Sequence, residues 1–350
     1  MTTVVEAYQA PSTERSAGVW VTAWRRLKGD RVGMISLAVV AGFLVMILAS
    51  VLGVVAGDWQ KEVGVPDAPP TFVGPRAAST GTDPIASVIA KDAKPVDLSD
   101  IDPLAPKYKE WAERAAKIQI TEAPRADTLP IGADRLGRDV LSKVIKGAEV
   151  SIFVGVFAAV LATLIGTILG AVSGYAGGKI GDFLEWVYNV FTSIPGILLI
   201  FAFAAVLGRG ISTVILILGL AGWTGIYRLV RAEYMKHRTR EYVRAAEAIG
   251  ASHFARMFVH ILPNVSHVVL VQLSLHAVFF IKAEVILSFL GLGVRVDQVS
   301  WGTMLSEAQA ELVLGHWWQL VATTISMAFF VTAFSLLTDA LRDALDPKLR

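Results

Sequence analysis

Six long stretches of the chain contain no aspartate, glutamate, lysine or arginine, and they constrain the fold more than any other feature. They are Val32–Gly57, Val150–Gly178, Trp186–Gly208, Gly210–Tyr227, Met257–Ile281 and Leu312–Thr338. A helix needs about 20 mostly apolar residues to cross a bilayer, and one central charge cancels the gain from several leucines. We therefore expect an all-α polytopic membrane protein with six transmembrane helices. The fifth should enter the membrane near Pro263.

The composition excludes several other classes of protein. Hydrophobic residues make up 54% of the chain and charged residues 18%, which is too apolar for a soluble enzyme or a disordered chain. A net charge of +2 does not indicate a nucleic-acid-binding protein. The absence of cysteine excludes disulfides and thiolate metal sites. A cleaved signal peptide is the alternative for the first stretch, but that stretch is longer than a signal core.

Short-loop lysines and arginines predict the orientation of the chain. Sixteen of them fall on the side of the N-terminal tail, Lys179, the segment 228–263 and the C-terminus, against three on the other side. Because such residues favour the cytoplasm, we expect both termini to be cytoplasmic. The predicted parts are a cytoplasmic tail over 1–31 with an interfacial helix, a first membrane helix over 32–57, an extracytoplasmic segment over 58–149, and a five-helix core over 150–350.

The extracytoplasmic segment holds ten of the 14 prolines, between Pro66 and Pro130, which disfavours long helices or central strands. One amphipathic helix is expected over Lys107–Gln119. A solvated linker and a docking surface for an external partner are both consistent with this composition.

No catalytic motif is present. The nearest approach to a phosphate-binding loop, Gly177-Gly178-Lys179, has Ser173 in place of the first glycine and Ile180 after the lysine. The chain should therefore not hydrolyse ATP itself, and we expect neither a bound cofactor nor a metal.

The segment between the fourth and fifth stretches combines helix-forming and helix-bending residues. Ala246, Gly250 and Phe254 are spaced by four and predict a small-to-apolar stripe on one helix face. Gly250 predicts a bend or a close contact, and Pro263 predicts a turn into the next helix. An ordinary amphipathic connector fits these residues as well as a docking helix does.

This segment resembles the EAA loop of ATP-binding-cassette importer permeases. That loop reads E-A-A, three residues, glycine, nine residues and I-x-L-P, which are matched here by Arg244-Ala245-Ala246, Gly250 and His260-Ile261-Leu262-Pro263. Arginine at 244 and histidine at 260 are similar to the peptide/nickel subfamily. Four further stretches resemble its C-type permease: residues 131–139, 287–294, 300–305 and 341–350. Lys282 departs from the pattern, standing where a small or apolar residue is expected.

The resemblance implies a type I importer permease fold and a set of partners. These are a homologous B-type permease forming a heterodimer, two ATP-binding subunits that hold ATP and Mg²⁺, an extracytoplasmic substrate-binding protein, and the bilayer of a prokaryotic inner membrane. Coupling to the ATPases would involve Glu241, Arg244, Ala245, Ala246, Gly250, Ala251, Phe254 and Pro263. Di- and oligopeptides are the implied substrates, with nickel complexes, glutathione-like peptides and oligosaccharides as alternatives.

Glu284 is the remaining candidate residue, because a carboxylate in a membrane helix is expected to face protein or water. A pathway role and a subunit contact are both open for it. An ion-coupled secondary transporter, an intramembrane enzyme and an interaction scaffold are the rival functions. The first would be expected to carry ionisable residues at mid-membrane, and stretches one to four and six carry none.

Overall fold

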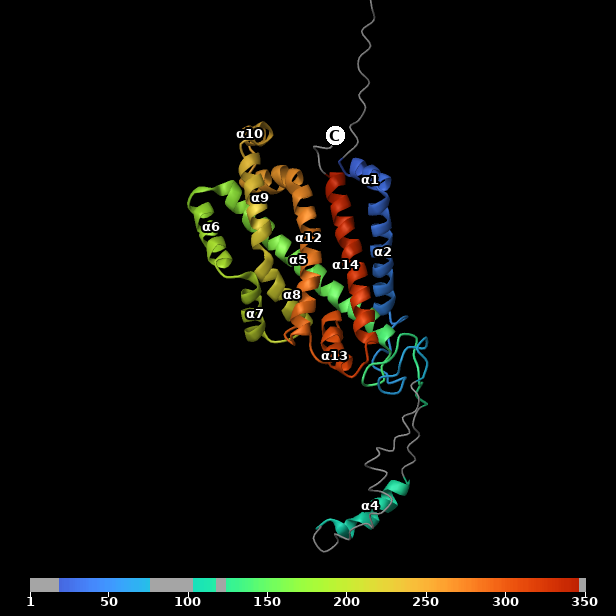
Figure 1. Cartoon of the computed structure of the whole chain (residues 1–350). Coiled ribbons are helices and arrows are strands. Elements are labelled where there is room, and N and C mark those ends of the chain that lie inside the picture. Colours follow the sequence, from blue (N-terminus) through green and yellow to red (C-terminus); the bar gives the residue numbers. More distant parts are fainter. Residues whose placement is uncertain (1–18, 76–102, 118–123, 346–350) are drawn as a thin grey trace, which may run out of the picture.

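The computed structural model describes residues 19–75, 103–117 and 124–345, and within them the secondary structure is helical apart from four isolated β-bridges. Figure 1 shows most of the helices side by side in one bundle, with α5 running obliquely across it. In chain order the helices are α1 Val19–Gly29, α2 Arg31–Val51, α4 Ala105–Lys117, α5 Val140–Ala176, α6 Gly178–Thr192, α7 Gly196–Leu207, α8 Ile211–Gly222, α9 Thr224–His237, α10 Glu241–Ala248, α11 His253–Ala255, the π-helical η1 Arg256–Ile261, α12 Leu262–Phe289, α13 Trp301–Val313 and α14 Trp318–Leu345.

Four helical segments of the described chain are long and apolar enough to cross a membrane, and up to six if each of two bent helix pairs is one span. The four are α2, α5, His253–Phe289 and α14. The pair α6 and α7 bends by 84°, and the pair α8 and α9 by 43°. The sharper bend falls at Pro195, which precedes α7 and has no N–H to continue α6.

Several predicted helix ends are wrong. The first membrane helix ends at Val51, before Gly57, and α5 begins at Val140 rather than Val150. The last predicted stretch began at Leu312, but that residue belongs to α13, and α14 starts only at Trp318. A charge-free run shows which residues can lie in lipid, but capping groups decide where a helix starts. At the start of α5, the Asp139 carboxylate accepts hydrogen bonds from the Leu141 and Ser142 N–H groups.

Close packing of α5 against α9 organises the core. At Gly170, an added Cβ would lie 2.7 Å from the carbonyl oxygen of Tyr227, and at Gly174 it would lie 2.5 Å from that of Arg231. The glycines spaced by four along α5 therefore let the two backbones touch. Gly178, four residues after Gly174, has no atom within 4 Å of such a Cβ, because it is the first residue of α6 and lies outside this contact.

Two parts of the segment 58–149 fold onto each other at one end of the bundle (Figure 1). Residues 58–75 and 124–139 share β-bridges, and Trp318 donates from Nε1 to the Ala133 carbonyl at 2.6 Å. Asp134 accepts from Lys143 Nζ at 2.7 Å and from Arg138 Nε at 2.7 Å. Burial raises the pKa of Asp134, but the two cations outweigh it and hold that pKa below its ordinary value. The predicted amphipathic helix is α4, over Ala105–Lys117, and Gln119 lies outside the described residues.

Candidate functional site: the segment from α10 to α12

The segment between α9 and α12 forms two helical pieces joined by a tight turn. The first piece, α10, ends at Ala248, and Gly250 follows with φ +88°. This left-handed backbone conformation favours glycine, so Gly250 ends the helix rather than lying inside it. Ser252 then starts the second piece, because its hydroxyl accepts from the Ala255 N–H at 3.2 Å.

No turn separates this second piece from the membrane helix. The helical backbone runs from His253 to Phe289 without a break, so the predicted turn at Pro263 is wrong. The π-helical geometry of η1 explains how the proline fits, because its wider turn ends just before Pro263, with the Leu262 N–H bonded to the Met257 carbonyl. Asn264 Nδ2 also donates to the His260 carbonyl at 2.8 Å, which satisfies one of the carbonyls near the proline.

Arg256 holds the two pieces together. It is 8% exposed and pairs with Glu247 at 2.5 Å, which joins the end of α10 to the start of η1. The same guanidinium bonds to His253 Nδ1 at 3.0 Å and lies over the Tyr175 ring at 5.8 Å. Because Tyr175 belongs to α5, one buried cation connects α10, the start of the long helix and α5.

A buried cluster fixes this assembly to the bundle. Val243 of α10 and Ile261 of η1 pack with Val230 and Tyr234 of α9 and with Ala171 of α5. The Tyr234 hydroxyl donates to the Met257 carbonyl at 3.1 Å. The segment is therefore a rigid projection of the bundle, continuous with a membrane helix.

The predicted coupling residues lie mostly on the surface of this projection. Ala246 is buried and Ala251 half-buried, whereas the exposed members are Glu241, Arg244, Ala245, Gly250, Phe254 and Pro263. The predicted stripe of Ala246, Gly250 and Phe254 does not form, because the turn at Gly250 places Ala246 inside and Phe254 outside. Phe254 is 67% exposed and the neighbouring Ile249 is 84% exposed, so the projection presents large apolar side chains.

Ile249, Arg256 and Tyr234 also belong to this site, and no motif in the sequence marks them. Arg256 follows Glu247 by nine residues, a separation that permits a contact across a helix–turn–helix. The contact depends on the turn at Gly250, whose geometry the residue spacing does not indicate. The end of the bundle that carries α10 also carries α1 and the last turns of α14, while α13 lies at the opposite end (Figure 1).

Glu284 lies away from any open surface. It is fully buried, accepts from Ser288 Oγ at 2.6 Å, and also interacts with Ser151 and Ser300. The three hydroxyl-bearing residues come from α12, α5 and the N-cap of α13, so Glu284 joins these three elements. In this conformation it has no exposed surface among the described residues, and it does not line the three cavities described below.

One face of α12 is lined by two cavities. The first, of about 620 Å³, lies towards α10 and includes Leu229, Glu233, His267, Val271 and Leu275 among its lining residues. The second, of about 530 Å³, is lined by α12 from the next residue, His276, onward and includes Gly196, Phe279, Lys282 and Ile286. Together they follow one side of the helix along most of its length.

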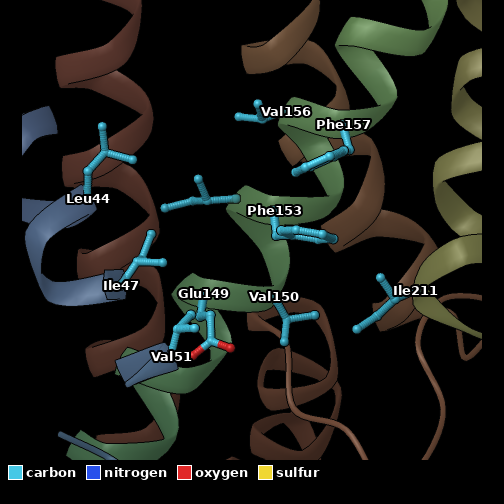
Figure 2. A pocket seen from close by; sticks show the side chains of 10 residues that line it. Leu44, Ile47, Val51, Glu149, Val150, Phe153, Val156, Phe157 and Ile211 are labelled. Atoms are coloured by element: carbon cyan, nitrogen blue, oxygen red, sulfur yellow. The ribbon is translucent and has the colours of Figure 1, made fainter. Parts of the chain in front are cut away.

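A third cavity, of about 460 Å³, lies between α2, α5 and α8 and is almost wholly apolar. Figure 2 shows Leu44, Ile47 and Val51 facing Phe153 and Val150 across it, with Glu149 at one end. The Glu149 carboxylate accepts from Ser50 Oγ at 2.6 Å and pairs with Lys146 at 2.8 Å. Its charge is therefore already balanced, and the groove offers apolar contact.

Comparison with known proteins places this arrangement in a family. The family described as "Binding-protein-dependent transport system inner membrane component" matches residues 166–350, which is more than half of the chain and includes the whole projection. The dipeptide transport system permease protein DppC of Bacillus subtilis is 39% identical over 219 residues, covering 63% of this chain and 68% of that protein. The glutathione transport system permease protein GsiD of Salmonella typhimurium is 41% identical over 221 residues, covering 63% and 72%.

A third relative extends the similarity to the outer segment. The dipeptide transport system permease protein DppC of Lactococcus lactis is 28% identical over 352 aligned positions, covering 99% of this chain and 96% of that protein. The chain belongs to the family of binding-protein-dependent transport system inner membrane components, and it is a multi-pass permease subunit of a bacterial ABC importer rather than the subunit that hydrolyses ATP.

Proposed function

We propose that this permease imports di- and oligopeptides and that the segment 241–263 couples it to separate ATPase subunits. The observation that carries the proposal is the rigid projection from α10 to α12. Its exposed apolar side chains, Ile249 and Phe254, are suited to a protein groove, and its backbone continues into a membrane helix. A force applied to α10 therefore reaches α12 without passing through a flexible linker.

The orientation follows from the charges at the two ends of the bundle. The end with α10 and α1 carries Arg25, Arg26 and Lys28 on α1 and a run of basic residues between α9 and η1. We place this end in the cytoplasm, with both termini, and the end with α13 and residues 58–75 outside. Each bent pair, α6 with α7 and α8 with α9, then counts as one span, giving six.

The partner permease has an apolar surface available to it. Large side chains recur along α5 at the spacing of one helix face and are exposed in the isolated chain: Phe153, Phe157, Val160, Leu164 and Ile168. We propose that a homologous B-type permease covers this face and the groove of Figure 2, forming the heterodimer. Two ATP-binding subunits would then contact the cytoplasmic projections, and a substrate-binding protein would dock outside.

Peptides are the proposed substrates because relatives named for dipeptide and oligopeptide transport align over most of their lengths. Glutathione is the second candidate, since a permease named for glutathione transport is 41% identical. The direct test loads the binding protein with a dipeptide or with glutathione and measures ATP hydrolysis by the reconstituted importer. Stimulation by the dipeptide supports the proposal, and stimulation by glutathione alone would replace it.

The coupling role has a separate test in the same system. Gly250→Trp should abolish uptake while leaving membrane insertion intact, because the bulky side chain would occupy the surface that meets the ATPase. Gly250→Asn is the matched control, since asparagine tolerates the left-handed backbone and adds little bulk. Normal uptake by the tryptophan variant would contradict the coupling role.

A further inference from the structure

Lys282 is a charged residue on an exposed face of a membrane helix. It lies seven residues before the end of α12, which is about 10 Å at 1.5 Å per residue. Its side chain is exposed in the isolated chain, and Phe279 and Ile286, about one turn to either side, are 56% and 46% exposed. A lysine facing lipid at this level is unfavourable, so its position calls for an aqueous or anionic neighbour.

No carboxylate of the described chain supplies that neighbour. The nearest acidic residue in sequence, Glu284, is buried and bonded to Ser288. None of the ion pairs among the described residues includes Lys282, although Lys143 and Lys146, which lie in α5, are both paired. The charge of Lys282 is therefore available to a group that enters from outside the chain.

The cavity beside Lys282 has the properties of a small-molecule site. Its volume of about 530 Å³ falls within the range of ligand pockets, and its lining is largely apolar, from α7, α8, the start of α9 and α12. The polar lining groups include Lys282, Thr224 and His276. The Nδ1 atom of His276 is buried and has no hydrogen-bond partner among the described residues, so this ring nitrogen is also free to bind a ligand.

We propose that Lys282, with His276 at the inner side of the same cavity, binds the free carboxylate of a peptide as it passes along α12. This inference rests on the proposed peptide import and specifies where the permease itself recognises its substrate. An ammonium group in an apolar cavity gives a strong charge-assisted interaction with a carboxylate. The cavity nearer α10 is lined by α12 as far as Leu275, and the cavity beside Lys282 is lined by α12 from His276 onward, so the two are neighbours along this helix.

The test uses the absence of cysteine from this chain. Lys282→Cys is introduced into the complete importer in proteoliposomes, which are then treated with water-soluble methanethiosulfonates. An aminoethyl reagent restores a positive charge at the new thiol, and a sulfonatoethyl reagent adds a negative one. The wild-type importer, treated in the same way, controls for thiols on the partner subunits.

We expect the untreated variant to take up a free dipeptide at least about tenfold more slowly than the wild type, as for loss of a charge-assisted contact. The aminoethyl reagent should restore uptake, and the sulfonatoethyl reagent should not. The dipeptide should also slow modification of the thiol, whereas its C-terminal amide should not. Ile325→Cys, on the exposed apolar face of α14, is the lipid-facing control, and Lys61→Cys, in the outer segment, is the water-exposed one.

Three results would overturn the inference. The first is a thiol at position 282 as unreactive as the one at position 325, which would place this position against lipid chains. The second is uptake that does not depend on the charge restored, and the third is equal protection by the acid and the amide. If the wild-type importer took up no dipeptide, the proposed function would itself be wrong, so the two failures can be told apart.

Discussion

Replacing Arg256 by methionine should uncouple ATP hydrolysis from transport. The guanidinium joins Glu247 of α10, His253 at the start of the long helix and the Tyr175 ring of α5, and methionine keeps most of the volume without the charge. A broken buried pair costs about 3–5 kcal/mol and an exposed pair contributes about 0.2–1 kcal/mol. Arg256 is buried and the Glu247 side chain is 62% exposed, so we expect a loss of about 1–2 kcal/mol.

This loss lowers the equilibrium ratio of the state in which α10 is held against the long helix to the state in which it is released by roughly 5- to 30-fold. The assay measures peptide transported per ATP hydrolysed in proteoliposomes, at equal amounts of inserted permease. We expect this ratio to fall several-fold in Arg256→Met and less in Glu247→Gln, which keeps the contacts to His253 and Tyr175. Arg228→Met, on an exposed position of α9, is the control. An unchanged ratio in Arg256→Met, or an equal fall in the control, would refute the reasoning.

Three further perturbations follow from the structure. Gly250→Ala should destabilise the turn by about 1 kcal/mol, because alanine disfavours a φ of +88°. It should slow uptake far less than Gly250→Trp does. An equal loss of uptake in both variants would show that backbone strain, and not side-chain bulk, causes the loss. Gly170→Ala should lower the thermal stability of the solubilised complex, because the new Cβ would lie 2.7 Å from the Tyr227 carbonyl oxygen. Gly42→Ala is the control and should not lower it, because the space around Gly42 is open. A similar melting temperature for both variants would contradict the tight α5–α9 contact. Burial raises the pKa of Glu311 from 4.5 to about 7. Between these two pH values the folded state keeps a proton that the unfolded state has lost. The free energy of unfolding should therefore fall as pH rises from about 4.5 to about 7. Glu311→Gln should flatten this pH dependence in thermal unfolding, and an unaltered profile would exclude Glu311 as its source.

The membrane character of the fold could be predicted from the charge-free runs, because the cost of a charge in lipid acts directly on the sequence. The bend at Pro195 and the end of α12 before Gly291 also have local causes, since proline and glycine act on the local backbone. The ends of α2, α5 and α14 could not be predicted, because capping groups and contacts with the outer segment decide them.

Within the candidate site, the sequence predicted helical structure between Glu241 and Pro263, but it predicted the wrong internal geometry. Spacing by four predicted a common face for Ala246, Gly250 and Phe254, and this holds only if the helix continues through Gly250. Pro263 predicted a turn between two helices, but the helix continues through it. The wider π-helical turn that ends just before Pro263 accommodates a residue without an N–H donor. The contact of Arg256 with Glu247 depends on both features, so it could not be found before they were known.

The most direct test of the coupling role is chemical cross-linking from the exposed tip of the projection. Ile249, 84% exposed, is replaced by cysteine in this cysteine-free chain, and a maleimide carrying a benzophenone is attached and activated by light in the assembled importer. Val296→Cys, 90% exposed near the opposite end of the bundle, is the matched control. We predict an adduct with an ATP-binding subunit from position 249 and none from position 296. An adduct from position 249 with the substrate-binding protein, or no adduct with an ATP-binding subunit, would contradict the proposed coupling.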